Sequence, residues 1–318
     1  MNRNDETIPI LCVVGATASG KSALSLALAE QLGGEIVSCD SMQVYRRMDV
    51  GTAKPTRDER LRVRHHLIDV VEPDEPFSCA EYVALASKAI RQISERGALP
   101  IVCGGTGLYL DALLRGGFEE TKSDPALRES LLAYAEAHGN HALHERLRAV
   151  DPESADAIHE NNVKRVARAL EIYESTGMTQ PESDRRSREL QSPYAARVIG
   201  LLYEPRELLY GRIDRRDDEM LAAGLREETE RLLGEGVFES NMTAAQAIGY
   251  KELLGYLGGI QSLLEATEEL KRATRRYAKR QMTWFGAKDY VEWIDMTDRG
   301  EVISLERAVD RVRCLIGR

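Results

Sequence analysis

The segment Gly15-Ala-Thr-Ala-Ser-Gly-Lys-Ser22 constrains the fold of this chain more than any other feature. It matches the pattern G-x-x-x-x-G-K-[ST], follows the apolar run 9–14 and precedes a helical segment that extends to about Leu32. In such a strand–loop–helix unit, glycines let backbone N–H groups turn toward anionic oxygens, and the helix N-terminus adds a partial positive charge. The sequence therefore predicts a phosphate-binding loop at one edge of a sheet.

Two side chains of this loop have direct roles in binding an anion. Lys21 places a positive charge beside phosphate oxygens, and the Ser22 hydroxyl can be a ligand of Mg²⁺, the expected cofactor. The motif does not specify which phosphate ester binds. The loop residues expected to surround it are Gly15, Thr17, Ala18, Ser19, Gly20, Lys21 and Ser22.

Strands and helices alternate over the first hundred residues. Strands are predicted at 9–14, 35–40 and 99–103, with a further candidate at 66–71. The segment Ser78-Cys-Ala-Glu81 has the form of a capping box that begins a helix. This order of elements predicts an α/β fold of the P-loop type, in which a mostly parallel sheet is flanked by helices.

Beyond Thr121 the alternating pattern gives way to helices alone. Asp124-Pro125 and Asp151-Pro152 each combine an N-cap residue with a proline in the first helical turn. No strand is expected before about Ser175. The polar segment 180–192 is typical of a loop.

The chain is expected to return to the sheet after this segment. Residues 198–203 have the composition of a core strand, and a last strand is expected near 290–294 in an otherwise helical C-terminal part. The sequence therefore predicts two domains. A P-loop core would be formed by 1–121 and 193–318, and an all-helical insertion by 122–192.

Composition limits the classes of protein to which the chain can belong. Of its 318 residues 43% are hydrophobic, which permits a sizeable core, and neither its polar start nor its short apolar runs suggest a secretory signal or a membrane span. Five cysteines without a Cys-x-x-Cys pair favour reduced thiols in the cytoplasm. The net charge of −9 argues against non-specific binding to nucleic acid, so such a partner would need a local basic face. We expect a cytoplasmic monomer.

Two further polar residues follow predicted strands. Asp40 ends 35–40 and Thr106 comes shortly after 99–103. Because ligands of open parallel sheets bind at the carboxyl ends of the strands, we expect both to converge with Lys21 on one crevice. Either could instead be a helix N-cap, Asp40 for a short helix beginning at Ser41, and the spacing leaves both roles open.

The strand at 99–103 ends in glycines and lacks the acidic residue that P-loop ATPases and GTPases use to bind Mg²⁺. Triphosphate hydrolysis is therefore not the expected activity, although a small-molecule kinase remains possible.

The segment 271–280 carries six basic residues in ten. At about 100° per residue they occupy one half of a helix, whereas Tyr277 and Trp284 fall on the other half and are expected to pack in the core. Pairing with Glu268 and Glu269, one turn earlier, is the alternative to a binding face.

The insertion carries two further polar clusters. Lys164, Arg165 and Arg168 share a face of one of its helices. The histidines 138, 141 and 144 are expected to be solvated, because no carboxylate pair or cysteine accompanies them to form a metal site.

Several separated motifs accompany the phosphate loop. They are Asp40-Ser-Met-Gln-Val-Tyr45, Asp49-Val-Gly-Thr-Ala-Lys-Pro55, His65-His-Leu-Ile-Asp69, Gly104-Gly-Thr-Gly-Leu-Tyr109, Gly249-Tyr250 and Lys279-Arg-Gln-Met-Thr-Trp-Phe285. Together with the phosphate loop, these motifs closely resemble the tRNA dimethylallyltransferases, also called tRNA isopentenyltransferases. The resemblance extends over nearly the whole chain.

The resemblance implies transfer of a dimethylallyl group from dimethylallyl diphosphate to N6 of adenosine 37, beside the anticodon of tRNA. It implies that Thr17–Ser22 hold the diphosphate with help from Arg212, that Asp40 is the general base and that Thr106 lies in the reaction channel. Gln43 would contact the target base. The other residues implied to face tRNA are Ser41, Met42, Arg128, Lys164, Arg165, Arg168, Gln246, Gly249, Tyr250, Lys251, Arg275, Arg276, Lys279, Arg280, Gln281, Thr283 and Trp284. A P-loop small-molecule kinase and a nucleotide-gated RNA-binding module are the alternatives.

Overall fold

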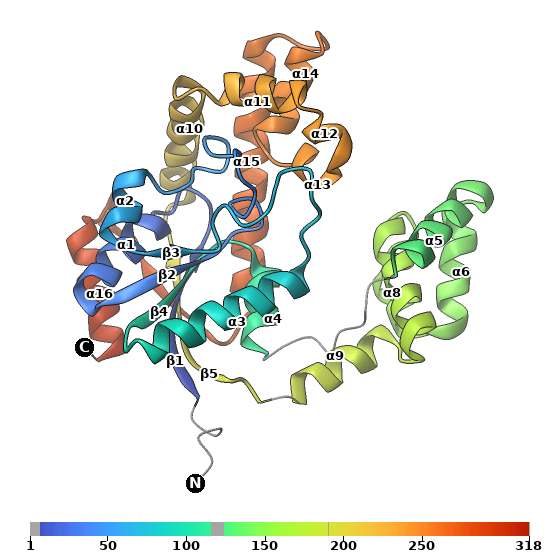
Figure 1. The fold of residues 1–318 in the computed structure, drawn as a ribbon, viewed down its shortest axis with the longest axis horizontal. Helices are drawn as coiled ribbons and strands as arrows, with labels where there is room; N and C mark the ends of the chain where they lie inside the picture. Colours follow the sequence, from blue (N-terminus) through green and yellow to red (C-terminus); the bar gives the residue numbers. More distant parts are fainter. Residues whose placement is uncertain (1–6, 116–123, 190, 318) are drawn as a thin grey trace. The chain divides into compact units, whose positions relative to one another are not determined.

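The computed structural model describes residues 7–115, 124–189 and 191–317 (Figure 1). The chain divides into two compact units, of which the first contains Met1–Leu113 and Tyr194–Arg318 and the second contains Leu114–Pro193. The helical insertion expected at 122–192 falls within the second unit. Its predicted boundary between residues 121 and 122 lies outside the described residues.

The first unit is built on a parallel sheet of six strands in the order β3-β2-β4-β1-β5-β6. This arrangement confirms the predicted mostly parallel sheet. The strands are β1 (Ile8–Gly15), β2 (Gly34–Cys39), β3 (His65–His66), β4 (Leu99–Gly104), β5 (Tyr194–Leu202) and β6 (Val291–Asp295). A separate antiparallel pair is formed by β7 (Thr297–Asp298) and β8 (Glu301–Val302).

The strand expected at 66–71 is much shorter than predicted. Leu67 and Asp69 have φ angles of 62° and 58°, which interrupt the extended backbone directly after β3. Val71 is extended again but forms only an isolated bridge with Tyr45. The segment therefore leaves the sheet edge instead of extending it.

Helices cover both faces of the sheet. Leu11 and Val13 of β1 pack in one core with α1 and α16, whereas Cys12 and Val14, which alternate with them, are buried on the other face. The predicted capping box at Ser78 is present at the start of α3. The helices around the sheet are α1 (Lys21–Leu32), α2 (Arg57–Arg62), α3 (Cys79–Glu95), α4 (Gly107–Leu114), α10 (Arg206–Ala222), α15 (Leu263–Gly286) and α16 (Leu305–Ile316).

A second core lies beyond the carboxyl ends of the strands. There Val44, Tyr45 and Met48, from the loop after β2, pack against a group of short helices and the first half of α15. The short helices are α11 (Leu225–Gly234), α12 (Val237–Ser240), α13 (Met242–Ala245) and α14 (Tyr250–Leu257). This core connects the loop after β2 to the helices of the C-terminal part.

The second unit is helical and has a core of its own, which contains Leu131, Leu143, Leu147 and Leu170. Both predicted N-caps are present, because Asp124 accepts a hydrogen bond from the Leu127 amide and Asp151 from the Ser154 amide, each at 3.0 Å. The helices are α5 (Pro125–His138), α6 (Asn140–Val150), α7 (Pro152–Ala157), α8 (Val163–Thr176) and α9 (Gln180–Glu189).

The prediction of a loop at 180–192 was wrong, because most of this segment forms α9. Thr179 and Glu182 cap this helix reciprocally, and the Gln180 amide donates to Asp151 Oδ2 at 3.0 Å. Hydrogen bonds at its start thus stabilise a helix whose sequence has no apolar face. No helix in the described parts of the chain has the length and hydropathy needed to cross a bilayer.

Candidate active site

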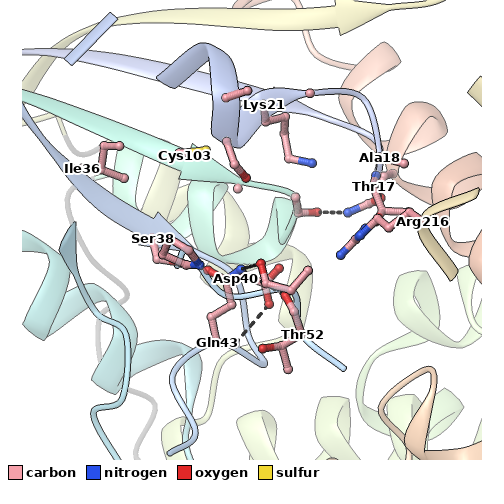
Figure 2. A pocket seen from close by; sticks show the side chains of 18 of the residues that line it. Thr17, Ala18, Lys21, Ile36, Ser38, Asp40, Gln43, Thr52, Cys103 and Arg216 are labelled. Carbon is pink, nitrogen blue, oxygen red and sulfur yellow. Dashed lines mark hydrogen bonds between the residues drawn. The ribbon is translucent and has the colours of Figure 1, made fainter. Parts of the chain in front are cut away.

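A pocket of about 510 Å³ opens at the carboxyl ends of β1, β2 and β4 (Figure 2). It is lined by the phosphate loop, by Asp40 directly after β2 and by Cys103 at the end of β4, as expected for an open parallel sheet. Residues of α10 and α15 form a further part of its wall, which includes Arg212, Arg215, Arg216, Tyr277 and Gln281. The rest of the wall comes from β2, β3 and the loops that follow them, and includes Gln43, Thr52, Ala53, His65 and Ile68.

The phosphate loop has the backbone geometry that anion binding requires. Ala18 and Gly20 have φ angles of 60° and 92°, and Gly20 is the N-cap of α1. Lys21 lies in the pocket, where its Nζ donates to the Ala16 carbonyl at 2.8 Å. Burial lowers the pKa of Lys21 to about 8, and the charge of Arg216 acts in the same direction. An anionic ligand would reverse this effect.

The predicted loop residues do not all face the pocket. Thr17, Ala18, Gly20, Lys21 and Ser22 line it. Gly15 and Ser19 are buried behind them, and Ser19 Oγ has no hydrogen-bond partner among the described residues.

Arginines of α10 face this loop. Arg212, which was predicted, donates from Nε to the Ala18 carbonyl at 2.9 Å. Arg216, which was not, hydrogen-bonds to Thr17 Oγ1, and its burial lowers its pKa. Arg216 could have been predicted from Arg212, because residues four apart on a helix lie on the same face. Lys21, Arg212 and Arg216 therefore form hydrogen bonds with this anion-binding loop, and Arg215 is a fourth cation in the pocket wall.

The two carboxylate oxygens of Asp40 have different surroundings. Its Oδ1 accepts hydrogen bonds from the backbone N–H groups of Met42, at 2.8 Å, and Gln43, at 3.4 Å. Residues 41–44 form a turn and not the helix that was considered for this position. Oδ2 accepts no hydrogen bond from any residue that the structure describes, so one oxygen of this pocket-lining carboxylate is available to a ligand.

Thr106 lies beside the pocket and not on its wall. Its Oγ1 accepts a hydrogen bond from the Ser41 amide at 3.1 Å, and its own amide donates to the Cys39 carbonyl at 3.2 Å. The neighbouring Gly104 packs so closely that a Cβ atom there would lie 2.0 Å from the Cys39 carbonyl oxygen. Thr106 thus ties the end of β4 to the Asp40 turn.

The oxygen and the nitrogen of the Gln43 side-chain amide are both hydrogen-bonded. Ser38 Oγ donates to Oε1 at 2.9 Å, and Nε2 donates to the carbonyls of Thr52 and Ala53 at 3.2 and 3.3 Å. Figure 2 shows Gln43 with Ser38 and Thr52 on the side of the pocket away from Lys21. Ser41 and Met42, predicted with Gln43, are partly exposed in the same turn.

The basic residues of α15 differ in whether their charges are paired with acidic side chains. Lys271 pairs with Asp218 at 2.7 Å and Arg275 with Asp214, so their partners come from α10 and not from Glu268 or Glu269. Arg276 is exposed and makes no ion pair with any described residue. The other exposed polar residues of this face are Arg272, Lys279, Arg280 and Thr283.

Trp284 and Gln281 differ from expectation. Trp284 is 41% exposed, so the prediction that it packs in the core was wrong. Its ring lies over Gly107, where a Cβ atom would come within 2.3 Å, and glycine has no side chain to cover the ring. Gln281 is 5% exposed, which does not suit a direct RNA contact. Instead it accepts from the Thr17 amide at 2.8 Å and donates to the Gly105 carbonyl at 3.0 Å.

A second, polar hollow of about 560 Å³ is lined by Gln246 and Lys251 together with Arg276 and Arg280. Gly249 adopts a φ of 99° just before α14. Tyr250 is fully buried, so its side chain is not available for the tRNA contact that the motif implied.

The predicted RNA-facing residues of the second unit also divide into two kinds. Lys164 and Arg165 are exposed on α8. Arg128 and Arg168 pair with the buried carboxylate of Glu171, at 2.7 and 3.0 Å. Glu171 therefore neutralises one of these two positive charges within the unit.

No group of three or more His, Cys, Asp or Glu side chains in the described residues is arranged to hold a metal ion. The prediction that all three histidines of α5 and α6 are solvated was wrong for His144. It is buried, with Nε2 2.8 Å from the Ile158 carbonyl and 3.0 Å from that of Ala155. It is a hydrogen-bonded core residue.

Comparison with known proteins gives a consistent result. Residues 43–288 match the family model described as IPP transferase. The chain is 52% identical, over 92% of both chains, to the tRNA dimethylallyltransferase of Geobacillus thermodenitrificans, and 48% identical, over 91% of both, to that of Halalkalibacterium halodurans.

Solved structures give the same result. One is the tRNA isopentenylpyrophosphate transferase of Bacillus halodurans, with a TM-score of 0.71, 44% identity and coverage of 98% of this chain and 96% of that one. Another is a eukaryotic dimethylallyltransferase described as acting on tRNA, with a TM-score of 0.80, 30% identity and coverage of 98% and 80%.

Proposed function

The chain belongs to the IPP transferase family, and on that basis we propose that it transfers a dimethylallyl group from dimethylallyl diphosphate to N6 of adenosine 37 in tRNA, releasing diphosphate. The observation that carries the proposal is the composition of one pocket, which is lined by a phosphate loop, three arginines and the carboxylate of Asp40. This arrangement suits a departing anion on one side and an attacking amine on the other.

Stabilising the leaving group is the main catalytic demand. The exocyclic amine of adenine is a weak nucleophile, so the allylic C–O bond must break as the new C–N bond forms, and negative charge builds up on the diphosphate. The loop amides, Lys21, Arg212 and Arg216 are positioned to bind that charge. The P-loop would thus hold a leaving group, and no phosphoryl group moves.

The proton that N6 loses has an acceptor in Asp40. An ionised carboxylate within hydrogen-bond reach can accept a proton from the amine as its nitrogen becomes positively charged. The Oδ2 atom of Asp40 is the available oxygen, since Oδ1 is used by the turn. Carbon–nitrogen bond formation, loss of diphosphate and proton transfer to Asp40 together balance the reaction.

The residues present fit a magnesium ion. Mg²⁺ prefers oxygen ligands and is commonly held by one or two protein groups together with substrate phosphates and water. Ser22 is exposed to the pocket beside Lys21 and would hold the ion through its hydroxyl. A bound Mg²⁺ would supply additional neutralisation of the diphosphate charge.

The proposal is tested by incubating the protein with dimethylallyl diphosphate, Mg²⁺ and unmodified tRNA, followed by mass analysis of the nucleosides. We expect a dimethylallylated adenosine at position 37. Phosphoryl transfer from ATP without a prenylated nucleoside would favour the small-molecule kinase, and RNA binding without any product would favour the RNA-binding module.

The affinity for dimethylallyl diphosphate is expected to fall as the pH rises above about 8. The ligand binds the protonated form of Lys21, whose pKa in the free protein is about 8. Binding is therefore fully favourable below this pH and weakens by up to about tenfold per pH unit above it. Calorimetric titration from about pH 7 to 9.5 measures this trend. In the Lys21→Arg variant, which stays charged, the decline should be absent, and an equal decline in both proteins contradicts the prediction.

Two neighbouring arginines of α15 are expected to contribute differently to tRNA binding. Arg276→Gln should flatten the dependence of log affinity on log salt by about one unit, because an exposed charge that releases a counterion is lost. Arg275→Gln is the matched control, and it should leave the slope unchanged because Arg275 is already paired with Asp214. Filter binding over a range of salt concentrations gives both slopes. Equal slopes for Arg276→Gln and the unmodified protein would remove Arg276 from the interface.

A further inference from the structure

Glu228, on α11, is a buried carboxylate that accepts four hydrogen bonds. Its Oε2 accepts from the amides of Asp49, at 2.9 Å, and Val50, at 3.0 Å. Its Oε1 accepts from the Gly51 amide at 3.0 Å and from the Tyr250 hydroxyl at 2.6 Å. Glu228 is 7% exposed, so these bonds are shielded from water. Three consecutive backbone N–H groups converge on a single charge, which makes this anchor stronger than neutral hydrogen bonds.

The anchored backbone leads directly into the pocket. Thr52 and Ala53 follow the three anchored amides, line the pocket and accept both hydrogen bonds from Gln43 Nε2. The position of the Gln43 amide therefore depends on where Glu228 holds the preceding residues. Figure 2 shows Gln43 and Thr52 together on the same side of the pocket.

The anchored turn is also packed tightly against its support. A Cβ atom on Gly51 would lie 2.4 Å from the Tyr250 ring, so only glycine allows this approach. Lys54, just beyond the turn, is almost fully buried and donates to the Tyr45 carbonyl at 2.6 Å. The loop is thus fixed at both ends and has little freedom to adjust if the central anchor is lost.

We propose that Glu228 is a positioning residue for prenyl transfer, which holds residues 49–53 so that Gln43 is fixed beside Asp40 where the target base enters. This inference rests on the proposed function. Glu228 lies behind the loop and touches neither substrate, so its effect is on the geometry of the bound base. Binding of the diphosphate, on the opposite side of the pocket, should be independent of it.

The test compares Glu228→Gln with the Asn241→Asp variant. The side-chain amide introduced by Glu228→Gln would point an N–H₂ group at backbone donors, so at least one of them loses its acceptor. Asn241 is equally buried in the same helical region, and its Nδ2 donates to the carbonyls of Pro73 and Glu75 at 2.9 Å. The control therefore perturbs a buried polar group of similar size without touching residues 49–53.

Three quantities are measured for folded protein: hydrogen exchange at the amides of 49–51, the single-turnover rate on tRNA and the affinity for dimethylallyl diphosphate. For Glu228→Gln we expect loss of protection at 49–51, a rate lower by about ten- to a hundredfold, and unchanged diphosphate affinity. Asn241→Asp should keep the protection and the rate. Wild-type protection and rate in Glu228→Gln would overturn the proposal.

Should Glu228→Gln fail to fold, Glu228→Asp provides the same test, because it keeps the charge and shortens its reach. Partial loss of protection at 49–51 must then be accompanied by a partial loss of rate. Lost protection with a full rate overturns the proposal. If the unmodified protein forms no prenylated nucleoside, the proposed function fails, while hydrogen exchange still decides whether Glu228 holds the loop.

Discussion

Replacing Asp40 with Asn is expected to lower the single-turnover rate of prenyl transfer by about 10²–10⁴-fold. Asn is isosteric with Asp, but it cannot accept the proton that N6 loses. Its Oδ1 can still accept the hydrogen bond that the Met42 amide donates at 2.8 Å, so the turn after β2 is preserved. The rate is measured with enzyme in excess over tRNA and with both substrates saturating.

The affinities for tRNA and for dimethylallyl diphosphate provide the control, and both should stay within about twofold of the unmodified protein because Asn is neutral and isosteric. Asp40→Ala removes the turn's acceptor as well and should lower the rate at least as much while also weakening tRNA binding. An Asp40→Asn protein with weakened binding and an unchanged chemical step would assign the carboxylate to structure and not to proton transfer.

Replacing Lys21 with Met is expected to lower the rate of prenyl transfer by about 10²–10³-fold. Met keeps much of the length of the side chain, so the main loss is the charge that faces the departing diphosphate. Because negative charge grows as the C–O bond breaks, the transition state should lose more than the ground state, and the rate should fall even at saturating substrate.

Single-turnover kinetics over a range of dimethylallyl diphosphate concentrations separates these effects. The affinity for tRNA should not change, and Lys21→Arg should recover part of the rate because the positive charge is kept. A rate that returns to the unmodified value at high diphosphate concentration would show that Lys21 serves binding alone.

The features that could be predicted from the sequence depend on residues close together in the chain. The phosphate loop is specified within eight residues, and the capping box at Ser78 and the proline-containing starts of α5 and α7 within about four. The parallel sheet follows from the alternation of such local units. The convergence of Lys21 and Asp40 follows in turn from the parallel sheet, because carboxyl ends of parallel strands share an edge.

The features that were missed depend on partners far away in the sequence. Gln281 was assigned to the RNA surface, but its hydrogen bond to the Thr17 amide joins residues 264 positions apart. Trp284 lies on the apolar half of its helix, yet it meets Gly107, which offers no side chain to cover it. A helical wheel identifies a face of a helix, and only the packing of the whole unit determines what that face meets.

The order of the strands determines when β1 can complete its pairing while the chain is being synthesised. β1 lies between β4 and β5, and its partners in β5 run from Tyr194, opposite Ile8, to Leu201, opposite Gly15. One side of the first strand to be synthesised therefore stays unpaired until the whole second unit has been translated. Helices of that unit, which have their own core, can form during this interval, while the open edge of β1 is exposed to pairing with other strands.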